Sequence, residues 1–510
     1  MTTSFKTKRR YAIARTIIGI IIILIQVLLY YVLFFHTHNV PYISIISLIV
    51  KLLCVSIIYN SDKNISYKLN WIIIILIFNL AGACFYLIFG TGRTLPKRKN
   101  KKINAYLNDK LSNCDEILNQ LKNEDLIGFK HASILHSSTD GYCLYDNTEN
   151  TFFNDGNTIY LDMLDKIKNA KKFIFLEYFI IGEGSLFNEL FDVLKEKALS
   201  GIEIKIMYDA VGCNKILDKK TVSKLNNISN IKIIAYNPLG TNNLTINYRN
   251  HRKITVVDGL YAYTGGFNLA DEYIHRKDRF GHWRDNGILI EGKATYSYTL
   301  LFAQNWYMST QEMLVIEDYK PIYNDSISKG YIFPFGDGPI TKKSPSYDLF
   351  LSLINNAQKS IYISTPYFII DIAFINAIAQ AIKSGVDVKI LLPEISDKKF
   401  FFPVTLEHCN NIILSGGEVY RYTPGFNHAK NIIVDGKYAF IGTVNVDYRS
   451  LFLNFECGNL LINTDSVKEM QKDFVNALNL SKKIELDEWN NRSITNRIRA
   501  FAFTLLGPLL

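Results

Sequence analysis

The sequence predicts an α/β protein built from two tandem copies of one domain, behind an N-terminal membrane anchor. Three observations predict this arrangement. Three sequence blocks recur in the same order, strand-like and helix-like segments alternate after residue 103, and the first hundred residues contain long apolar stretches. A chain of 510 residues is also too long for one ordinary hydrophobic core, so more than one domain is expected.

Residues 1–102 are predicted to form the membrane anchor. The stretches 17–35 and 71–89 carry no charge, and each is close to the ~20 residues that a spanning helix needs. The stretch 43–59 has Lys51 near its centre, where a lysine costs roughly 2.5–3.5 kcal/mol at mid-bilayer. We therefore expect the outer two stretches to cross the bilayer and 43–59 to be re-entrant or interfacial.

Basic residues flank the anchor on both sides. Both clusters favour the cytoplasmic face, which requires an even number of crossings. The chain is thus expected to be a multi-pass protein of the cell membrane, with its remaining domains in the cytoplasm. The second cluster is explained equally well as a stop-transfer signal or as a contact with anionic lipid. The two clusters are Lys6, Lys8, Arg9, Arg10 and Arg15, then Arg93, Lys97, Arg98, Lys99, Lys101 and Lys102.

Seven scattered cysteines form no C-x-x-C pair and no cysteine–histidine spacing of a zinc site. An odd number of unpaired cysteines is typical of reduced thiols in a cytosolic domain.

The internal repeat defines two domains. "AKKFIFLEYFII" from Ala170 recurs as "AQKSIYISTPYFII" from Ala357, and "GIEIKIMYD" recurs as "GVDVKILLP". The third block is "NHRKITVVDG" from Asn250, which recurs as "NHAKNIIVDG" from Asn427. Strand–helix–strand alternation within each copy indicates an α/β layer arrangement. We predict a linker at 103–129, domains at 130–324 and 325–490, and an amphipathic tail at 491–510.

The third block carries residues suited to chemistry. On a strand, side chains two residues apart point to the same face, so each histidine projects with its lysine. The aspartate falls at an Asp-Gly turn. Downstream, a glycine is expected to let backbone approach a ligand, and an asparagine to donate to a phosphate oxygen. The matched sets are His251, Lys253, Asp258, Gly265 and Asn268, and His428, Lys430, Asp435, Gly442 and Asn445.

Two copies related by a two-fold axis would bring both sets to one seam. Two histidines, two lysines and two asparagines would then surround one anion, which suits phosphodiester chemistry. One imidazole attacks phosphorus, while the other protonates the leaving alcohol and then deprotonates the incoming one. The lysines neutralise the phosphoryl oxygens, so we expect neither a metal nor a cofactor. The pseudo-symmetry leaves open which histidine attacks.

The paired H-x-K-x(4)-D motifs, followed by "GGFN" in one half and "GTVNVDYRS" in the other, resemble the phospholipase D superfamily over about residues 130–490. The resemblance implies a phosphohistidine intermediate, with His251 as the nucleophile and His428 as the acid/base. It also implies that a downstream carboxylate orients each histidine, at Asp285 and Glu456. For Asp285 the alternative is a salt bridge with Arg284.

Position 443 departs from the superfamily pattern. Thr443 follows the second glycine, where most relatives carry serine. The hydroxyl is retained, so the same supporting role at the phosphate is expected.

Segments outside the strips resemble bacterial cardiolipin synthases. They are "NLAGACFYLIFGTGR", "ADEYIHRKDRFGHWRD" and the C-terminal "RIRAFAFTLLGPLL". The resemblance implies phosphatidyl transfer from one phosphatidylglycerol to another, which yields cardiolipin and glycerol. The implied partners are a phospholipid substrate and the membrane. The tail has two competing positions, against the bilayer or on the protein's own surface.

Three other functions compete with this one. A membrane-bound phospholipase D or another phosphatidyltransferase would use the same motifs. A nuclease is disfavoured, and no nucleic-acid partner is expected, because basic residues cluster at the membrane flank rather than along the domains. An inactive scaffold would have lost a histidine or lysine. Tyr178 and Tyr367 also recur in the repeat, a pattern more typical of core positions than of a lipid channel.

Overall fold

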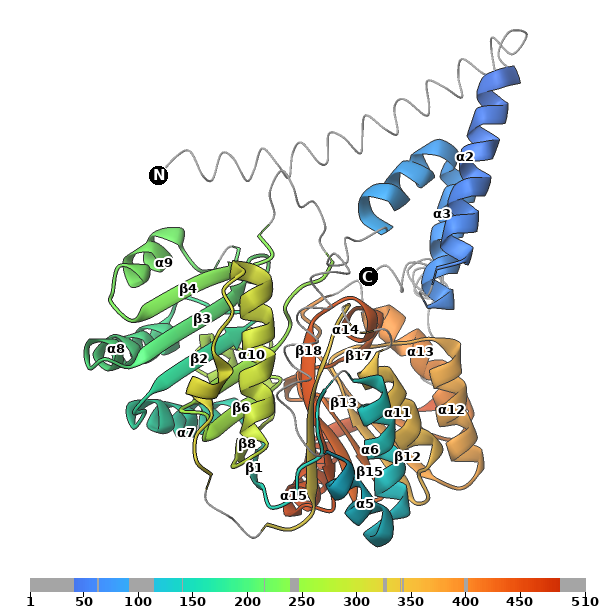
Figure 1. Cartoon of the computed structure of the whole chain (residues 1–510). Coiled ribbons are helices and arrows are strands. Elements are labelled where there is room, and N and C mark those ends of the chain that lie inside the picture. The colour runs from blue at the N-terminus through green and yellow to red at the C-terminus, as the bar shows by residue number, and fades with distance from the viewer. Residues whose placement is uncertain are drawn as a thin grey trace. The chain divides into compact units, whose positions relative to one another are not determined.

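The structure is a computed structural model of the whole chain (Figure 1). It describes residues 41–61, 64–90, 114–139, 141–214, 216–238, 247–323, 328–339, 341, 344–398 and 402–486. Two compact units are present, an N-terminal helical unit and a larger α/β unit, and each is considered by itself.

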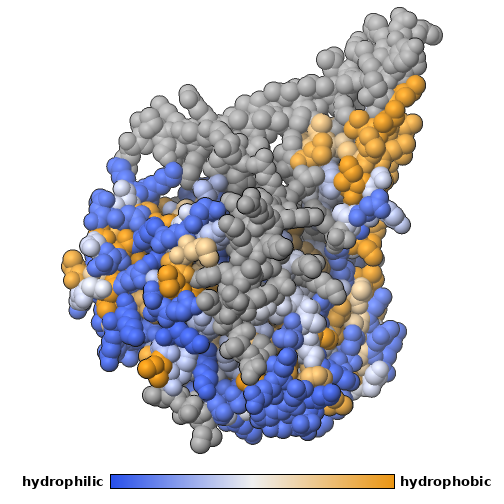
Figure 2. Space-filling model, viewed as in Figure 1, coloured by the Kyte–Doolittle hydropathy of each residue, from blue (hydrophilic) through white to orange (hydrophobic). Residues whose placement is uncertain are grey.

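The N-terminal unit contains α2 (Pro41–Tyr59), α3 (Ile65–Phe85) and the π-helical turn η1 (Tyr86–Gly90). The helices pack through a small apolar cluster that includes Ile58, Trp71 and Ile75. Large apolar side chains remain exposed on the other faces of both helices, and Figure 2 shows the resulting hydrophobic surface. They include Ile45, Leu48, Leu52, Leu53, Ile57, Leu69, Leu76, Ile77 and Phe78.

None of the helices among the described residues combines the length and apolar character needed to cross a membrane. The predicted stretches 43–59 and 71–89 fall within α2, α3 and η1. The stretch 17–35 and the tail 491–510 lie outside the described residues.

Part of the predicted linker is folded onto the α/β unit. Residues 114–129 belong to α5 (Cys114–Glu124) and α6 (Leu126–Ser138). The Asp125 carboxylate caps α6 and also accepts a hydrogen bond from Tyr438 Oη at 2.9 Å. His131 Nδ1 lies 2.8 Å from Ser352 Oγ. Because these contacts join α6 to the second half of the chain, 103–129 is not a free connector.

The cysteines also differ from the sequence expectation. Cys143 is disulfide-bonded, so the prediction that all the thiols are reduced is wrong at this position.

The first half folds around a seven-stranded mixed sheet in the order β1-β8-β6-β5-β2-β3-β4. Strands β2, β3 and β4 are parallel, and the remaining neighbours are antiparallel. The strands are β1 (Glu149–Phe153), β2 (Phe173–Tyr178), β3 (Glu203–Asp209), β4 (Ile231–Tyr236), β5 (Lys253–Val257), β6 (Tyr261–Gly265) and β8 (Gly287–Glu291).

The second half repeats this order as β9-β18-β16-β15-β10-β12-β13, with β19 added at the edge. The strands are β9 (Tyr331–Asp337), β10 (Ser360–Ser364), β12 (Asp387–Pro393), β13 (Glu418–Tyr422), β15 (Asn431–Val434), β16 (Tyr438–Gly442), β18 (Glu456–Ile462) and β19 (Ser481–Lys483). The duplicated α/β fold predicted from the repeat is therefore confirmed strand by strand.

Two short strand pairs lie outside the main sheets. β7 (His282–Arg284) pairs with β14 (Gly425–Asn427), and β11 (Phe368–Ile369) pairs with β17 (Val446–Asp447). The first pair joins the two halves immediately before Asp285 and His428.

Helices pack on both sheets. On the first sheet, α7 and α8 cover one face, while the buried helix α10 packs on the opposite face with residues of both halves (Figure 1). The helices are α7 (Gly156–Lys168), α8 (Ser185–Leu199), α9 (Lys219–Asn226), α10 (Thr295–Thr310), α11 (Pro345–Asn355), α12 (Ile372–Lys383), α13 (Phe402–Leu414), α14 (Tyr448–Phe452) and α15 (Asp465–Asn479), with 3₁₀ turns η2 (Asp271–Ile274) and η3 (Ile316–Tyr319).

Each repeated strip ends in the predicted Asp-Gly turn. Asp258 and Gly259 have φ of 54° and 69°, and Asp435 and Gly436 have φ of 56° and 63°. Two successive positive φ values define the type I′ turn, which matches the twist of the joined strands.

The turn aspartates bind backbone amides at the start of the neighbouring antiparallel strand, β2 in the first half and β10 in the second. The Asp258 carboxylate accepts from the N–H groups of Lys171, Lys172 and Phe173 at 2.7–3.0 Å. Asp435 makes the matching bonds to residues 358–360 in the second half. These turns lie at the far ends of β5 and β15 from the lysines, so the structure does not bring either aspartate to the histidines.

Substituting Asp258 by alanine tests this structural role. Three amides lose a charged acceptor, so we expect the free energy of unfolding to fall by about 2–4 kcal/mol. Turnover of the folded protein should change little. Urea denaturation with a parallel activity assay measures both quantities.

Asp192→Ala, which removes an exposed carboxylate from α8, is the matched control and should change stability by less than about 0.5 kcal/mol. A stable Asp258→Ala variant without activity would instead place this carboxylate in the chemistry.

Candidate active site

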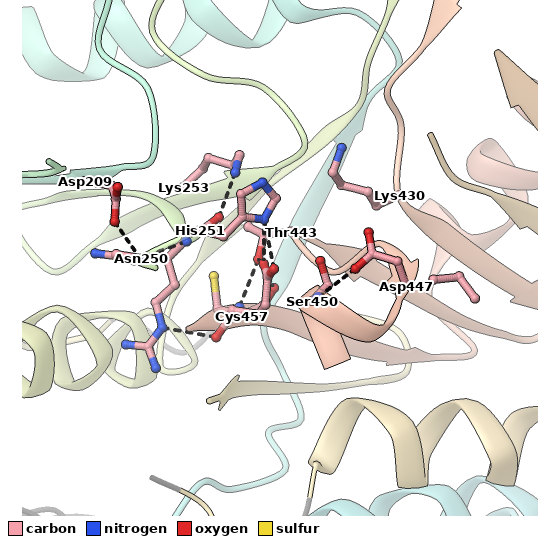
Figure 3. A network of polar contacts seen from close by, with 12 residues as sticks. Asp209, Asn250, His251, Lys253, Lys430, Thr443, Asp447, Ser450 and Cys457 are labelled. Atoms are coloured by element: carbon pink, nitrogen blue, oxygen red, sulfur yellow. Dashed lines mark hydrogen bonds and ion pairs between the residues drawn. The ribbon is translucent and has the colours of Figure 1, made fainter. Parts of the chain in front are cut away.

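The two histidines are held by carboxylates from opposite halves of the chain. Figure 3 shows the polar network around His251. Nδ1 of His251 lies 2.9 Å from both oxygens of Glu456, which begins β18 in the second half. Nδ1 of His428 lies 2.7 Å from Asp285 Oδ2 in the first half. A carboxylate at Nδ1 fixes the tautomer and leaves Nε2 of each ring for chemistry.

Backbone hydrogen bonds also link each histidine to the opposite half of the chain. The His251 N–H donates to the carbonyl of Phe455 at 2.9 Å, and the His428 N–H donates to the carbonyl of Arg284 at 2.7 Å. In each case the acceptor directly precedes the orienting carboxylate. Each histidine is therefore clamped through its backbone and its ring by one short segment of the other half.

The alternative prediction, a salt bridge between Asp285 and Arg284, is wrong. Arg284 forms an ion pair with Asp473 and donates to Asn427 Oδ1 at 2.8 Å. This leaves Oδ2 of Asp285 on His428 and Oδ1 on its neighbouring amide, Asn286 N–H.

Both lysines point to the same side as their histidines. Lys253 Nζ donates to the carbonyl of His251 at 2.7 Å, and Lys430 makes the matching bond to His428. Both lysines are fully buried. Burial lowers the pKa of Lys253 to about 7 and that of Lys430 to about 8, although Glu456 and Asp285 oppose the shift. Neither amine is bonded to a carboxylate of the described residues, and two such buried amines form a site for an anion.

The histidines differ in their electrostatic surroundings. Burial lowers the pKa of His251 well below its ordinary value, and the positive charges of Lys253 and Lys430 lower it further. The pKa of His428 is lowered to about 4 by burial and Lys430, but Asp285 acts in the opposite direction. Each imidazole remains 11 % exposed, so neither is sealed from a substrate.

The two motif asparagines are not equivalent. Asn268 is fully engaged, because its Oδ1 accepts from Ile180 N–H at 3.1 Å and its Nδ2 donates to Tyr273 Oη at 2.7 Å. Asn445 is 7 % exposed, and its Oδ1 has no hydrogen-bond partner among the described residues. Because Oδ1 only accepts hydrogen bonds, Asn445 would have to contact a phosphate oxygen through its Nδ2 group.

The motif glycines serve strand packing. A Cβ at Gly265 would lie 2.4 Å from the carbonyl oxygen of Asn286, and one at Gly442 would lie 2.4 Å from that of Cys457. The space beside each glycine is thus filled by the neighbouring strand. The expectation that these glycines admit a ligand is not met.

The residue that follows each motif glycine differs between the halves, and the size of the neighbouring carboxylate explains the difference. Thr443 Oγ1 donates to Glu456 Oε2 at 2.5 Å and so holds that carboxylate toward His251. In the first half the matching residue is Gly266, where a Cβ would lie only 2.0 Å from Asp285 Oδ1. The shorter aspartate occupies the space that the threonine side chain fills in the other half.

Sequence reasoning missed the asparagine that precedes each histidine. Asn250 Nδ2 donates to the buried Glu177 at 2.8 Å, and Asn427 Nδ2 donates to Ser364 Oγ at 3.0 Å. Glu177 and Ser364 occupy matching positions on β2 and β10. The recurrence of "NH" in both strips was the signal for this anchoring role.

Aromatic rings surround the imidazoles. Phe179 packs edge-on against His251, with ring centres 5.0 Å apart. Tyr273, Trp283 and Phe426 each lie 5.5 Å from the His428 ring. These rings limit access of water to the catalytic groups, and their sequence context predicts only core packing.

The described residues include no group of three or more side chains arranged to hold a metal ion. The site instead presents two imidazoles and two amines around one seam.

Substitution of Gly266 by alanine tests the crossed clamp. The new methyl group must displace the Asp285 carboxylate and misorient His428, so we expect kcat to fall by about 100-fold. Thermal unfolding measured in parallel separates this effect from loss of fold. A kcat within twofold of the parent would show that the Asp285–His428 contact does not govern the chemistry.

Comparison with known proteins identifies the family of this chain. The family described as cardiolipin synthase, PLD-like domain, matches residues 163–306 and 350–478, and the phospholipase D-nuclease N-terminal family matches residues 45–90. Cardiolipin synthase from Alkalihalophilus pseudofirmus is 34% identical over 89% of this chain and 91% of its own length. Cardiolipin synthase 2 from Bacillus anthracis is 34% identical over 89% of each chain.

The fold is shared with a solved enzyme of lower sequence similarity. Phosphatidylserine synthase from Haemophilus influenzae superposes with a TM-score of 0.57 at 15% identity, and covers 74% of this chain and 99% of its own. The resemblance inferred from the paired motifs is confirmed, and the chain belongs to the cardiolipin synthase family of phospholipase D-like proteins.

Proposed function

We propose that this protein is a phosphatidyltransferase that makes cardiolipin and glycerol from two molecules of phosphatidylglycerol. The observation that carries the proposal is the pair of histidines, each clamped at Nδ1 by a carboxylate from the opposite half, beside two buried lysines. The relatives named cardiolipin synthase support the lipid substrate.

The first half-reaction forms a phosphohistidine. Nε2 of His251 attacks phosphorus, the bond from phosphorus to the headgroup oxygen breaks, and His428 gives its proton to the departing glycerol. The strongly lowered pKa of His251 supports its role as nucleophile, because burial and two lysines keep its ring neutral. Asp285 favours the charged form of His428, and the phosphate of a bound substrate raises the pKa of that histidine further.

In the second half-reaction His428 takes the proton from the hydroxyl of a second phosphatidylglycerol. The resulting alkoxide attacks phosphorus, the phosphorus–nitrogen bond breaks, and His251 is released neutral. Lys253 and Lys430 neutralise the phosphoryl oxygens in both steps, with Asn445 beside them. This charge balance requires no metal ion.

We also propose that residues 1–102 attach the protein to the membrane, with the α/β unit on the cytoplasmic side. The exposed apolar faces of α2 and α3 and the two basic clusters support this placement. A site at the membrane raises the local concentration of acceptor lipid relative to water.

Single-cysteine labelling at positions 63 and 102 from each side of the membrane measures this topology. Cytoplasmic labelling at 102 is expected, and labelling of 102 from outside would overturn the orientation.

The reaction is tested with labelled phosphatidylglycerol in vesicles that contain the full-length protein. Cardiolipin plus glycerol is the expected outcome. Phosphatidic acid plus glycerol would identify a phospholipase, and cleavage of an oligonucleotide with the lipid untouched would identify a nuclease.

His251→Ala and His428→Ala are each expected to lower transfer by at least about a thousandfold, because each removes one half of a shared mechanism. The folded state of both variants is checked by thermal unfolding. Substantial transfer by either variant would contradict the single-site mechanism.

The lysines predict the pH dependence of phosphate binding by the free protein. Their lowered pKa values, about 7 and about 8, mean that the ammonium form is present at lower pH and is lost as the pH rises through this range. We therefore expect the affinity for a soluble phosphodiester, measured as binding without turnover, to weaken as the pH rises above about 7. An exposed lysine would keep its charge beyond pH 9, so a flat profile up to pH 10 would contradict the buried-amine account.

A further inference from the structure

The pseudo-two-fold symmetry of the site is broken beside His428 by a hydrogen-bonded tyrosine–aspartate pair. Tyr367 Oη donates to Asp397 Oδ1 at 2.6 Å. Lys398 Nζ lies 4.9 Å from the centre of the Tyr367 ring. The chemistry described above uses none of these three side chains.

Strand register fixes the position of Tyr367. It directly precedes Phe368, which pairs with Val446, the residue after the unpartnered Asn445. Tyr367 therefore lies next to Asn445, the motif asparagine of the second half.

The loop that carries Asp397 is fastened to the strand that leads to His428. The N–H groups of Glu394 and Ile395 both donate to the carbonyl of Gly425, at 3.2 and 3.3 Å. Gly425 begins β14, which ends one residue before His428. Burial lowers the pKa of Lys430, and Asp397 is among the negative charges that oppose the shift, in keeping with its closeness to that lysine.

No such pair is present among the residues of the first half that the structure describes. The pairing of Ile181 with Leu269 in the first half matches that of Phe368 with Val446 in the second. The residue before each first partner is then Ile180 in the first half and Tyr367 in the second. Ile180 is therefore the structural counterpart of Tyr367, although the sequence repeat aligns Tyr178 with it. Asp397 stands four residues beyond β12, and Cys213 stands four residues beyond β3. The buried Cys213 Sγ accepts from the Ile181 N–H at 3.1 Å and offers no charge.

We propose that Tyr367 and Asp397 bind the hydroxyl groups of the glycerol headgroup on the His428 side of the site. This inference rests on the proposed function. The leaving glycerol and the attacking phosphatidylglycerol must both meet the acid/base histidine, so one hydroxyl-binding position serves both half-reactions.

The charges at this position select an uncharged polyol. With its proton donated to Asp397, the Tyr367 oxygen accepts hydrogen bonds, and the carboxylate has further lone pairs for a hydroxyl donor. Lys398 offsets the negative charge of Asp397 and disfavours a cationic headgroup such as ethanolamine. The structure thus assigns acceptor preference to the second half.

The test uses full-length protein in phosphatidylglycerol vesicles with isotope-labelled glycerol, propan-1-ol and ethanolamine as competing soluble acceptors. The label distinguishes the phosphatidylglycerol formed by transfer to glycerol from the substrate. The wild-type protein should favour glycerol. Tyr367→Phe and Asp397→Asn should each lower the ratio of glycerol product to propanol product by about tenfold, equal to one lost hydrogen bond. Release of phosphatidic acid, measured in the same samples, reports the first half-reaction.

Cys213→Ser changes the matching position of the first half and should leave the product ratio unchanged. An unaltered ratio in both second-half variants would overturn this inference alone. Absence of phosphatidyl transfer to any alcohol by the wild-type protein would overturn the proposed function as well.

Discussion

The crossed contacts between histidine and carboxylate are the constraint on which the whole site depends. Glu456 of the second half holds His251 of the first, and Asp285 of the first half holds His428 of the second. Neither half alone has an oriented imidazole. A shift of one half relative to the other would misplace both histidines together. The buried seam and the backbone hydrogen bonds across it hold the halves in register and so keep both rings oriented.

The near-symmetry of the strands supports an asymmetric site. Identical strand orders place the two histidines and the two lysines alike, but the surrounding groups differ. One carboxylate is a glutamate steadied by Thr443, whereas the other is an aspartate that requires Gly266. One asparagine is fully bonded and the other is not. A two-step transfer needs this inequality, since one imidazole attacks while the other exchanges protons.

Much of this arrangement could be predicted from the sequence. The repeat predicts the duplicated sheet, and the motifs predict which side chains meet. The roles of Asp258, Gly265 and Gly442 could not be read from their positions, because a motif records recurrence without saying whether a residue contacts substrate or backbone. The folded segment 114–129 was predicted as a linker because the partners of its helices, Ser352 and Tyr438, lie more than two hundred residues away along the chain.

The central claim is that the orienting contacts cross between the halves, and ¹⁵N NMR of histidine-labelled protein tests it directly. Glu456→Gln should give its largest change at the imidazole of His251, and Asp285→Asn at that of His428, with each resonance assigned by substitution of its histidine. The opposite pattern, in which each carboxylate variant perturbs the histidine of its own half, would contradict the account.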